Sequence, residues 1–373
     1  MLTKLTGLFT LQQPNQASVL NQKENTMSES SDTQTAHENM GSDPSANAER
    51  DLFSARTQLK PYEYSGFLEY TDAIRNSYWV HTEFNFAGDV QDYRVNTTPA
   101  EQTVIKRTML AIAQIEVQVK TFWSDIYEKM PKAEVGSVGM TFAESEVRHM
   151  DAYSHLLDIL GITDDFEEVT EEPAIKQRIE YLDDCLQRAK EGSREEYAMS
   201  ILLFSTFVEH VSLFSQFLVM TSFDKYEKKF KGIANAVEAT SKEEQIHGLF
   251  GVELVKTIQK ENPDLFGEDF EEDVKQSCMQ AYEAEMGILD WIFEDGELGF
   301  LPRTHIDEFL KGRFNQSLEN VDVDPVFNVD DSLLDETRWF DEDIMMTKDN
   351  DFFSKRATTY NKHTQSVTVE DMF

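Results

Sequence analysis

Two glutamates stand alone in strongly apolar stretches, and they limit the folds open to this chain more than any other feature of its sequence. Glu209 is the only acidic residue in ILLFSTFVEHVSLFSQFLVM (201–220), and Glu116 is the only one in LAIAQIEVQV (110–119). In both stretches the apolar residues recur at helical spacing. A carboxylate inside such a helix is costly to bury unless it is paired or binds a metal ion. The fold must therefore bring cationic partners to both positions.

Each isolated glutamate is followed, 30 to 35 residues later, by a Glu-x-x-His pair. These pairs are Glu146/His149 in ESEVRH and Glu244/His247 in KEEQIH. Residues i and i+3 share one face of a helix, so both side chains of a pair point the same way. A Glu from each of two helices and a Glu-x-x-His from each of two others form the ligand set of a di-metal carboxylate site in a four-helix bundle. Carboxylate oxygens with some imidazole suit iron or manganese, and the lack of thiolates argues against zinc or an iron–sulfur cluster.

The rest of the chain favours helices over strands. Its 373 residues include only 9 Pro and 16 Gly, and strand-like alternation of useful length is absent from the sequence, so we expect an all-α fold. Thr98, Pro99 and Glu101 form a helix-start signature, with a capping residue, a proline in the first position and a capping box. Helical periodicity extends from there to about residue 130 and recurs at 142–161, 171–191, 195–222, 226–260, 268–295 and 303–319.

The two ends of the sequence differ from its middle. Residues 1–58 are rich in Ser, Asn, Gln, Thr and acidic residues, which is typical of a disordered leader. We place the helical domain at 59–320. An acidic, irregular segment and a flexible tail follow at 321–373. The tail ends in VEDMF, an acidic and hydrophobic sequence typical of a segment that docks on a partner.

Composition excludes several classes of function. The formal net charge of −36 argues against nucleic-acid binding, because such a surface repels phosphate backbones. No run of 18 or more apolar residues predicts a membrane span. Cys185 and Cys278 lie far apart without metal-ligand spacing, so we interpret them as free thiols in a reducing cytoplasm, or simply as small core residues.

From about residue 60 to residue 373, the sequence that carries these motifs resembles the small, radical-generating subunit of class I ribonucleotide reductase. That family consists of ferritin-like helical dimers. The resemblance implies a ferritin-like bundle with a dinuclear metal centre that activates oxygen, and a radical that serves the reduction of ribonucleotides to deoxyribonucleotides in a large subunit. The six implied metal ligands are Glu116, Glu146, His149, Glu209, Glu244 and His247.

The resemblance also implies a path for the radical. Tyr153, one turn after His149, would be the radical tyrosine, although a core tyrosine is the plainer alternative. The segment NSYWVHTEFNF carries the tryptophan of the path at Trp79, and Glu243 takes the place of the acid that links this tryptophan to the first metal-bound histidine. In the tail, Tyr360 would be the relay tyrosine, and the last residues would dock on the large subunit.

Three departures from the family pattern leave the metals open. Glu116 and Glu243 stand where the best-known members have aspartate, and the spacing from Glu116 to Glu146 is about one residue shorter than usual. Two irons are favoured, with manganese–iron and two manganese ions as alternatives, and in some members the oxidising equivalent stays on the metals. The implied partners are a second copy in a homodimer, the large subunit, and an activating flavoprotein or ferredoxin.

Other di-metal proteins share the two Glu-x-x-His motifs. A ferritin-like oxygenase or desaturase is the main alternative, followed by an iron-storage ferroxidase and a non-catalytic scaffold. Trp79, Tyr153 and the tail that bears Tyr360 favour the reductase subunit. Leu213 and Phe217 follow Glu209 on its helix face, where they either shield the phenol or belong to the ordinary core.

Overall fold

The computed structural model describes residues 50–345, with side chains through residue 343. Predictions that concern 1–49 and 346–373, including Tyr360 and the docking tail, lie outside the described residues. Within 50–345 every regular element is a helix or a helical turn, apart from one isolated bridge between Leu298 and Leu301. The all-α prediction is confirmed.

The helices are labelled in chain order. The first half contains α1 (Leu68–Ser77), α2 (Ala87–Gln91), α3 (Pro99–Ile115), α4 (Val119–Lys129), α5 (Ala133–Leu160), α6 (Asp165–Val169) and α7 (Pro173–Glu191). The second half contains α8 (Arg194–Leu203), α9 (Phe214–Ser222), α10 (Lys231–Glu261), α11 (Phe270–Ile292), α12 (Arg303–Asn320) and α13 (Asp331–Leu334). Three π-helical segments are η3 (Asp92–Asn96), η4 (Phe204–Ser212) and η5 (Phe223–Glu227), and another, η8 (Phe340–Met345), closes the described chain. Short 3-10 turns are η1 (Ser65–Phe67), η2 (His81–Glu83), η6 (Pro263–Leu265) and η7 (Asp335–Thr337).

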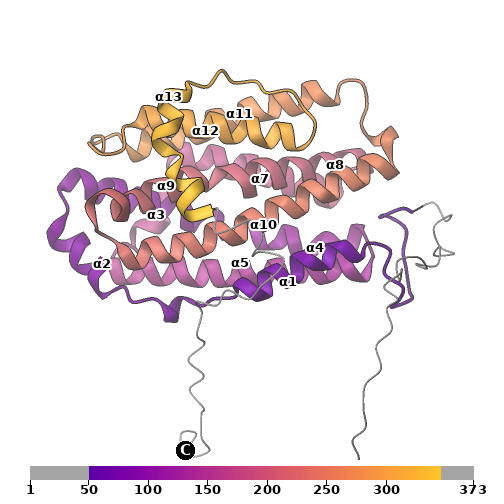
Figure 1. The fold of residues 1–373 in the computed structure, drawn as a ribbon, viewed down its shortest axis with the longest axis horizontal. Coiled ribbons are helices and arrows are strands. Elements are labelled where there is room, and N and C mark those ends of the chain that lie inside the picture. Colours follow the sequence, from indigo (N-terminus) through magenta and orange to yellow (C-terminus); the bar gives the residue numbers. More distant parts are fainter. Residues whose placement is uncertain (1–49, 346–373) are drawn as a thin grey trace, which may run out of the picture. The chain divides into compact units, whose positions relative to one another are not determined.

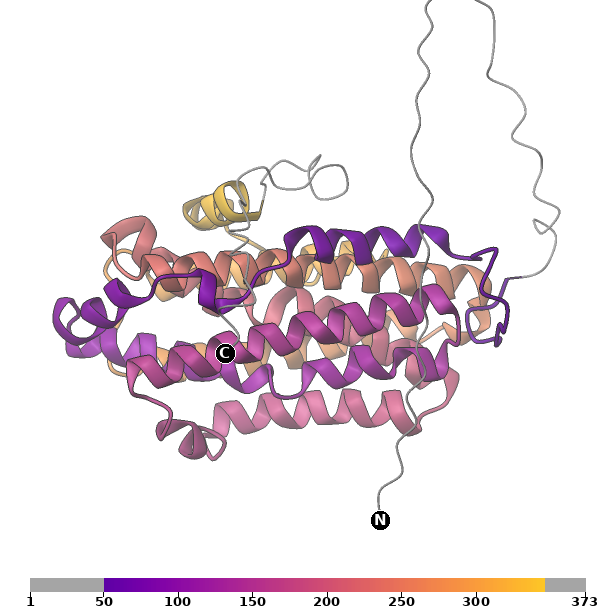
Figure 2. The same cartoon turned by 90° about the horizontal axis from the view of Figure 1, so that it is seen from below.

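One nearly continuous apolar helix forms the middle of the bundle. It consists of α8, η4 and α9, and it lies between α10 on one side and α11 with α12 on the other (Figure 1). On the far side of α10, α5 packs against α4 and α1 (Figures 1 and 2). As a result, the α3–α4 junction, α5, η4 and α10 surround a common interior, which is the arrangement that a four-helix metal site needs.

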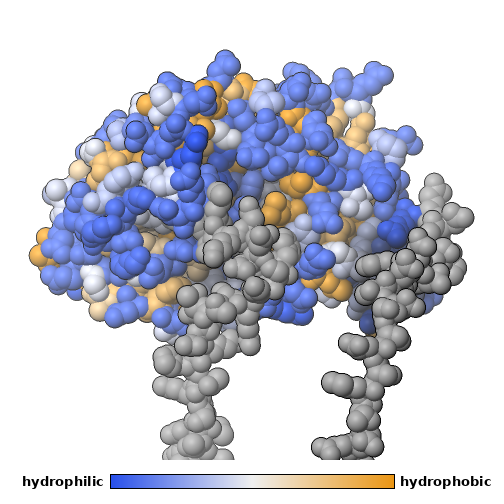
Figure 3. Space-filling model, viewed as in Figure 1, coloured by the Kyte–Doolittle hydropathy of each residue, from blue (hydrophilic) through white to orange (hydrophobic). Residues whose placement is uncertain are grey.

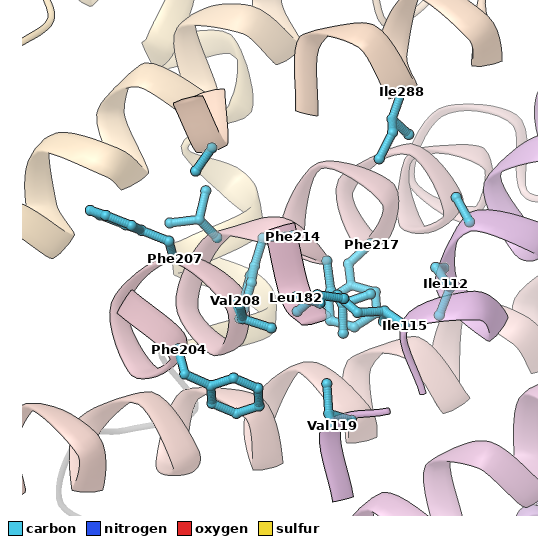
Figure 4. Packing of buried hydrophobic residues seen from close by; sticks show 14 of the residues in the cluster. Ile112, Ile115, Val119, Leu182, Phe204, Phe207, Val208, Phe214, Phe217 and Ile288 are labelled. Carbon is cyan, nitrogen blue, oxygen red and sulfur yellow. The ribbon is translucent and has the colours of Figure 1, made fainter. Parts of the chain in front are cut away.

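The core is continuous and rich in aromatic side chains. Figure 4 shows part of it, where Phe204, Phe214 and Phe217 pack with aliphatic residues that include Ile112 and Leu182. The segment Arg194–Glu227 is long and apolar enough to span a membrane by composition, but its most apolar window is entirely buried, as expected for a core helix. The face seen in Figure 3 is mostly hydrophilic, with hydrophobic residues in small patches, in line with the strongly acidic composition.

Several helix ends are held as the sequence predicts. Thr98 and Glu101 form the expected capping box at the start of α3. At the start of α10 a distant side chain performs this role, because Asp89 accepts hydrogen bonds from the backbone N–H groups of Gly232 (3.2 Å) and Ile233 (2.7 Å). Gly232 is required there, since an added Cβ would lie 2.5 Å from Asp89 Oδ2.

The structure corrects three boundaries drawn from the sequence. The helix expected from Pro99 to about residue 130 is interrupted between Ile115 and Val119, and α5 begins at Ala133 rather than near residue 142. The segment after 321, expected to be irregular, contains the short helical elements α13, η7 and η8.

Residues 50–58, which composition places in the leader, include residues that contact the helical body. Arg56 pairs with the buried carboxylate of Glu134, and the Leu52 N–H donates to Glu261 at 3.0 Å. A partnered charge of this kind fixes the chain at a point where composition alone predicts disorder.

Candidate metal centre

The six predicted ligands meet in one buried cluster, although they come from four separate segments. The ligand atoms form two overlapping sets, each with all its atoms within 4.8 Å of one another. The sets are Glu116, Glu146, His149 and Glu244, and Glu146, Glu209, Glu244 and His247. None of the six residues is more than 2% exposed. Two four-ligand sets that share two carboxylates could hold two metal ions.

Each of the two shared carboxylates directs one oxygen toward His149 and the other toward His247. Glu146 places Oε2 3.3 Å from His149 Nδ1 and Oε1 2.9 Å from His247 Nδ1. Glu244 places Oε1 2.9 Å from His149 Nδ1 and Oε2 3.1 Å from His247 Nδ1. Both imidazoles therefore direct Nδ1 toward the carboxylates, in the position that a metal ligand would occupy.

The electrostatics of the cluster call for cations. Burial raises the pKa of Glu116 well above its ordinary value; His149 opposes this rise, whereas Glu146 and Glu244 reinforce it. Burial also raises the pKa of Glu209 strongly, with added repulsion from Glu244 and Glu146. Hydrogen bonds to carboxylates raise the pKa of both histidines despite their burial. Two divalent cations would cancel the four negative charges of the carboxylates and return both imidazoles to the neutral ligand form.

Glu116 gives the clearest sign that a bound group is needed. Its Oε1 and Oε2 are both buried and neither has a hydrogen-bond partner. An unpaired buried carboxylate costs several kcal/mol, so a cation next to it would remove a large penalty. Glu116 lies at the interruption between α3 and α4, where Lys120 Nζ donates to the carbonyl oxygens of Glu116 (3.1 Å) and Val117 (2.7 Å). These bonds replace helical hydrogen bonds that the interruption removes.

Glu209 is positioned by a residue that the sequence did not reveal. It lies in the π-helical segment η4, and its Oε1 accepts a 2.6 Å hydrogen bond from the indole N–H of Trp123 in α4. This bond leaves Oε2 directed at the cluster, 3.6 Å from His247 Nδ1. Insertions of π-helix are frequent at functional sites, because they turn one side chain without ending the helix.

Outer hydrogen bonds fix the orientation of both imidazoles. His247 Nε2 lies 3.0 Å from the Ser145 hydroxyl, which donates to the Phe142 carbonyl. His149 Nε2 lies 2.8 Å from Glu243 Oε2. Partners of this type set the tautomer and direction of metal-binding histidines.

Trp79, Glu243 and His149, which the family resemblance links, lie in contact with one another. The Trp79 indole N–H donates to Glu243 Oε2 at 3.1 Å, so one carboxylate oxygen contacts both Trp79 and His149. The Trp79 and His149 rings are also stacked, with centroids 5.7 Å apart and an interplanar angle of 16°. Trp79 is only 3% exposed. A continuous contact therefore runs from beneath the protein surface to the metal cluster.

Tyr153 is buried next to the cluster, and its hydroxyl donates to Thr240 Oγ1 at 3.2 Å. Burial raises the pKa of the phenol, and the Glu116 charge raises it further. The neutral phenol is thus strongly favoured, and loss of an electron from it would require loss of its proton as well. Leu213 and Phe217 are buried as expected, and Figure 4 shows Phe217 among core side chains that include Ile115 and Leu182.

A model of the family "Ribonucleotide reductase, small chain" matches residues 56–337. The chain belongs to this family. It is 24% identical over 326 residues to a protein of Invertebrate iridescent virus 3 named "Probable ribonucleoside-diphosphate reductase small subunit", with 83% of this chain and 86% of that protein covered. The ribonucleotide reductase R2 subunit from Clostridium botulinum has a similar fold, with a TM-score of 0.68, 18% identity, and 75% of this chain and 88% of that chain covered.

Two further solved structures with this fold carry metals. One is the dimanganese(II)-NrdF protein of Streptococcus sanguinis, with a TM-score of 0.64, 16% identity, and 77% and 99% of the two chains covered. The other is an R2-like ligand-binding oxidase with a Mn/Fe cofactor, with a TM-score of 0.60, 18% identity, and 69% and 93% covered. Together with the cluster geometry, they support a di-metal site in this reductase small subunit and leave the identity of its metals open.

Sequence reasoning missed four residues that support the centre. They are Trp123, Ser145, Arg148 and Thr240. Only Arg148 carried a local signal, since it is a charged residue next to His149 on a helix predicted to be buried. The other three act on residues far away in the sequence, so no local pattern connects them to the site.

Proposed function

We propose that this small subunit holds two metal ions between Glu116, Glu146, His149, Glu209, Glu244 and His247 and generates the radical that a large subunit uses to reduce ribonucleotides. The observation that carries this proposal is the pair of overlapping four-ligand sets with two shared carboxylates. When bound, the metal pair supplies the oxidising power by reaction with oxygen. We propose two irons, and manganese–iron or two manganese ions fit the same oxygen and nitrogen donors.

Tyr153 is proposed to store the radical. Its burial excludes solvent reductants, and the Thr240 hydroxyl is the hydrogen-bond partner that faces its phenol oxygen. A buried phenol with a single hydroxyl neighbour can lose an electron without becoming accessible to side reactions. This role is separate from metal binding, so the two can be tested independently.

Trp79 and Glu243 are proposed to connect this store to the outside. An electron that enters at Trp79 passes inward through the stacked Trp79–His149 pair. Glu243 Oε2 contacts Nε1 of Trp79 and Nε2 of His149, which fixes the two rings relative to each other. Tyr360 in the C-terminal tail is proposed to continue the path, and the end of the tail is proposed to dock on the large subunit.

Members of this family work with a large subunit and are typically dimeric. We propose the same homodimer here, supported by the exposed apolar side chains of Tyr127 on α4 and of Met140 and Val147 on α5, because exposed apolar groups of this kind favour association. An activating flavoprotein or ferredoxin and a cytoplasmic location complete the proposal.

The test combines metal analysis with low-temperature electron paramagnetic resonance. Full-length protein is loaded with iron, manganese or both, then exposed to oxygen, and wild type is compared with Tyr153→Phe. A tyrosyl signal in wild type that is absent from the variant, at equal metal content, would support the proposal and identify the working metals. A metal-centred signal that the variant leaves unchanged would move the radical from Tyr153 to the metals. Failure to bind any metal would refute the proposal.

A matched pair of variants separates the reductase from an oxidase. Trp79→Phe is expected to leave metal content unchanged but to abolish ribonucleotide reduction with the large subunit, because the reductase must pass electrons between its own centre and a second subunit. Trp291→Phe, which changes a tryptophan whose ring packs under Arg107 and away from the centre, is the control. An oxidase that acts on its own substrate would reduce no ribonucleotide in wild type or in either variant.

A further inference from the structure

Arg148 is a buried arginine that contacts both Trp79 and Glu243, the two residues that lead to His149 in the ligand cluster. It lies in α5 immediately before His149, and its side chain is only 5% exposed. Its NH1 donates to Glu243 Oε2 at 3.1 Å and its NH2 to Glu243 Oε1 at 3.2 Å. The two bonds form a fork that fixes the plane of the carboxylate, which a single bond would not do.

The same guanidinium also holds the tryptophan segment. NH1 donates to the Trp79 backbone carbonyl at 3.0 Å. The guanidinium carbon lies 4.5 Å from the centre of the Tyr78 ring and 5.9 Å from that of Trp79. The Nε atom is anchored by Glu144, one turn earlier on α5, at 3.0 Å. Hydrogen bonds from Nε and from NH1 and NH2 thus hold the Arg148 guanidinium in one position, unlike a mobile charge at the surface.

Glu243 needs such a support because its side chain is long. A glutamate has one more rotatable bond than an aspartate, so its carboxylate can take more orientations. Here Oε2 alone accepts from Trp79 Nε1 (3.1 Å), contacts His149 Nε2 (2.8 Å) and accepts from Arg148 NH1. The Ser77 hydroxyl, at 3.3 Å from Oε1, is the other partner of this carboxylate. Without the fork, rotation of the carboxylate would break the contact with the indole or with the imidazole.

We propose that Arg148 is the positioning residue of the Trp79–Glu243–His149 link, holding the Glu243 carboxylate in the orientation in which one oxygen contacts both rings. This inference rests on the proposed function. Lys242, the residue before Glu243 on α10, directs its ammonium to Glu238 at 2.5 Å and so does not share the role of Arg148. Loss of the fork should leave metal binding intact and weaken only the connection to Trp79.

The first measurement uses metal-free, full-length protein with ¹⁵N-labelled tryptophan. Each of the four indole N–H signals is assigned with a Trp→Phe variant, and the signals are compared in wild type, Arg148→Lys and Arg148→Gln. We expect the Trp79 signal to shift and its proton to exchange faster with solvent in both variants, while the signals of Trp123, Trp291 and Trp339 stay in place. An unchanged Trp79 signal would overturn the proposal, and movement of all four signals would reduce Arg148 to a general structural role.

The second measurement uses metal-loaded protein with the large subunit. In Arg148→Lys and Arg148→Gln we expect metal content within about twofold of wild type, but ribonucleotide reduction lower by about 10- to 100-fold, the range typical of a misplaced reacting group. Lys242→Gln, the matched control, should stay within about twofold, as expected for a partly exposed i, i+4 pair. Full activity in Arg148→Lys would show that charge rather than the fork matters, and a parallel loss of bound metal would place the defect at the metals; either result overturns the proposal. If wild type reduces no ribonucleotide, the proposed function fails, while the indole signals still decide whether Arg148 positions the link.

Discussion

Replacing Arg178 with methionine should destabilise the protein by an amount that depends strongly on pH. Arg178 is a buried arginine of α7 that bonds to the Ala111 carbonyl in α3 and to Gln216 Oε1 in α9 (3.5 Å). Its guanidinium also lies 4.0 Å from Glu285 in α11, and both side chains of this pair are only 2% exposed. Removal of one partner of a buried ion pair leaves the other charge uncompensated, which typically costs about 3–5 kcal/mol.

The pH dependence follows from Glu285. Burial raises the pKa of Glu285 to about 7, although Arg178 partly opposes this rise. An acid whose pKa is higher in the folded protein holds its proton more tightly there, so stability falls as the pH rises from the unfolded pKa near 4.5 to the folded pKa near 7. Wild type should therefore level off above pH 7. Without Arg178 the folded pKa rises further, and the variant should keep losing up to about 1.4 kcal/mol per pH unit above pH 7.

The assay is urea unfolding of metal-free protein, followed by circular dichroism at pH 6, 7 and 8. Effects of the metal ligands on the pH dependence are common to all variants and cancel in the differences. Arg178→Met combined with Glu285→Gln should remove the extra pH dependence, because no acid remains at the site. Arg188→Met, on the same helix but in an exposed pair with Asp184, should cost no more than about 0.5 kcal/mol. A loss for Arg178→Met that is equal at pH 6 and pH 8, or below about 1 kcal/mol at both, would refute the reasoning.

Three further changes test other parts of the structure. Glu116→Gln should raise the melting temperature of metal-free protein at pH 8, because it removes an unpartnered buried charge, yet lower the bound metal measured by mass spectrometry; a lower melting temperature would contradict this account of Glu116. Gly232→Ala should cost about 2 kcal/mol in urea unfolding, since its Cβ would lie 2.5 Å from Asp89 Oδ2 and 2.6 Å from the Asn85 carbonyl oxygen, and a neutral result would show that both groups can move away. Thr98→Ala should cost about 1 kcal/mol through loss of the capping box, whereas Thr98→Ser should be close to neutral.

The parts of the centre that sequence reasoning could predict are those with a local signature. Glu146/His149 and Glu244/His247 follow from the i, i+3 rule, and both pairs lie on regular stretches of α5 and α10. Glu209 follows from the cost of a charge in an apolar helix. The capping box of α3 follows from residue types alone.

What the sequence could not predict depends on tertiary contacts. Trp123 reaches Glu209 across 86 positions, and Arg178 joins α7 to helices that follow much later in the chain. The order of residues 50–58 depends on the pairing of Arg56 with a carboxylate on α5, which composition does not reveal. Each of these contacts forms only after the helices pack, so propensity and periodicity contain no information about them.

The shape of the backbone at the ligands shows why the two kinds of ligand differ. A Glu-x-x-His pair works only on a regular α-helix, because any change in winding would turn one member of the pair away from the other. A single glutamate has no such restriction. Glu116 lies at the interruption between α3 and α4, and Glu209 lies in the π-helical segment η4.

Irregular backbone therefore occurs at the two ligands that can tolerate it. At both positions the side chain can point in a direction that a regular α-helix would not allow. The cost is a set of unsatisfied backbone groups, which at Glu116 is offset by the hydrogen bonds from Lys120. The interruption also accounts for the short spacing between Glu116 and Glu146. In a continuous helix, a spacing shorter by one residue would rotate the Glu116 side chain by about 100° around the helix axis. The break in the helix allows the side chain to reach the cluster despite the shorter spacing.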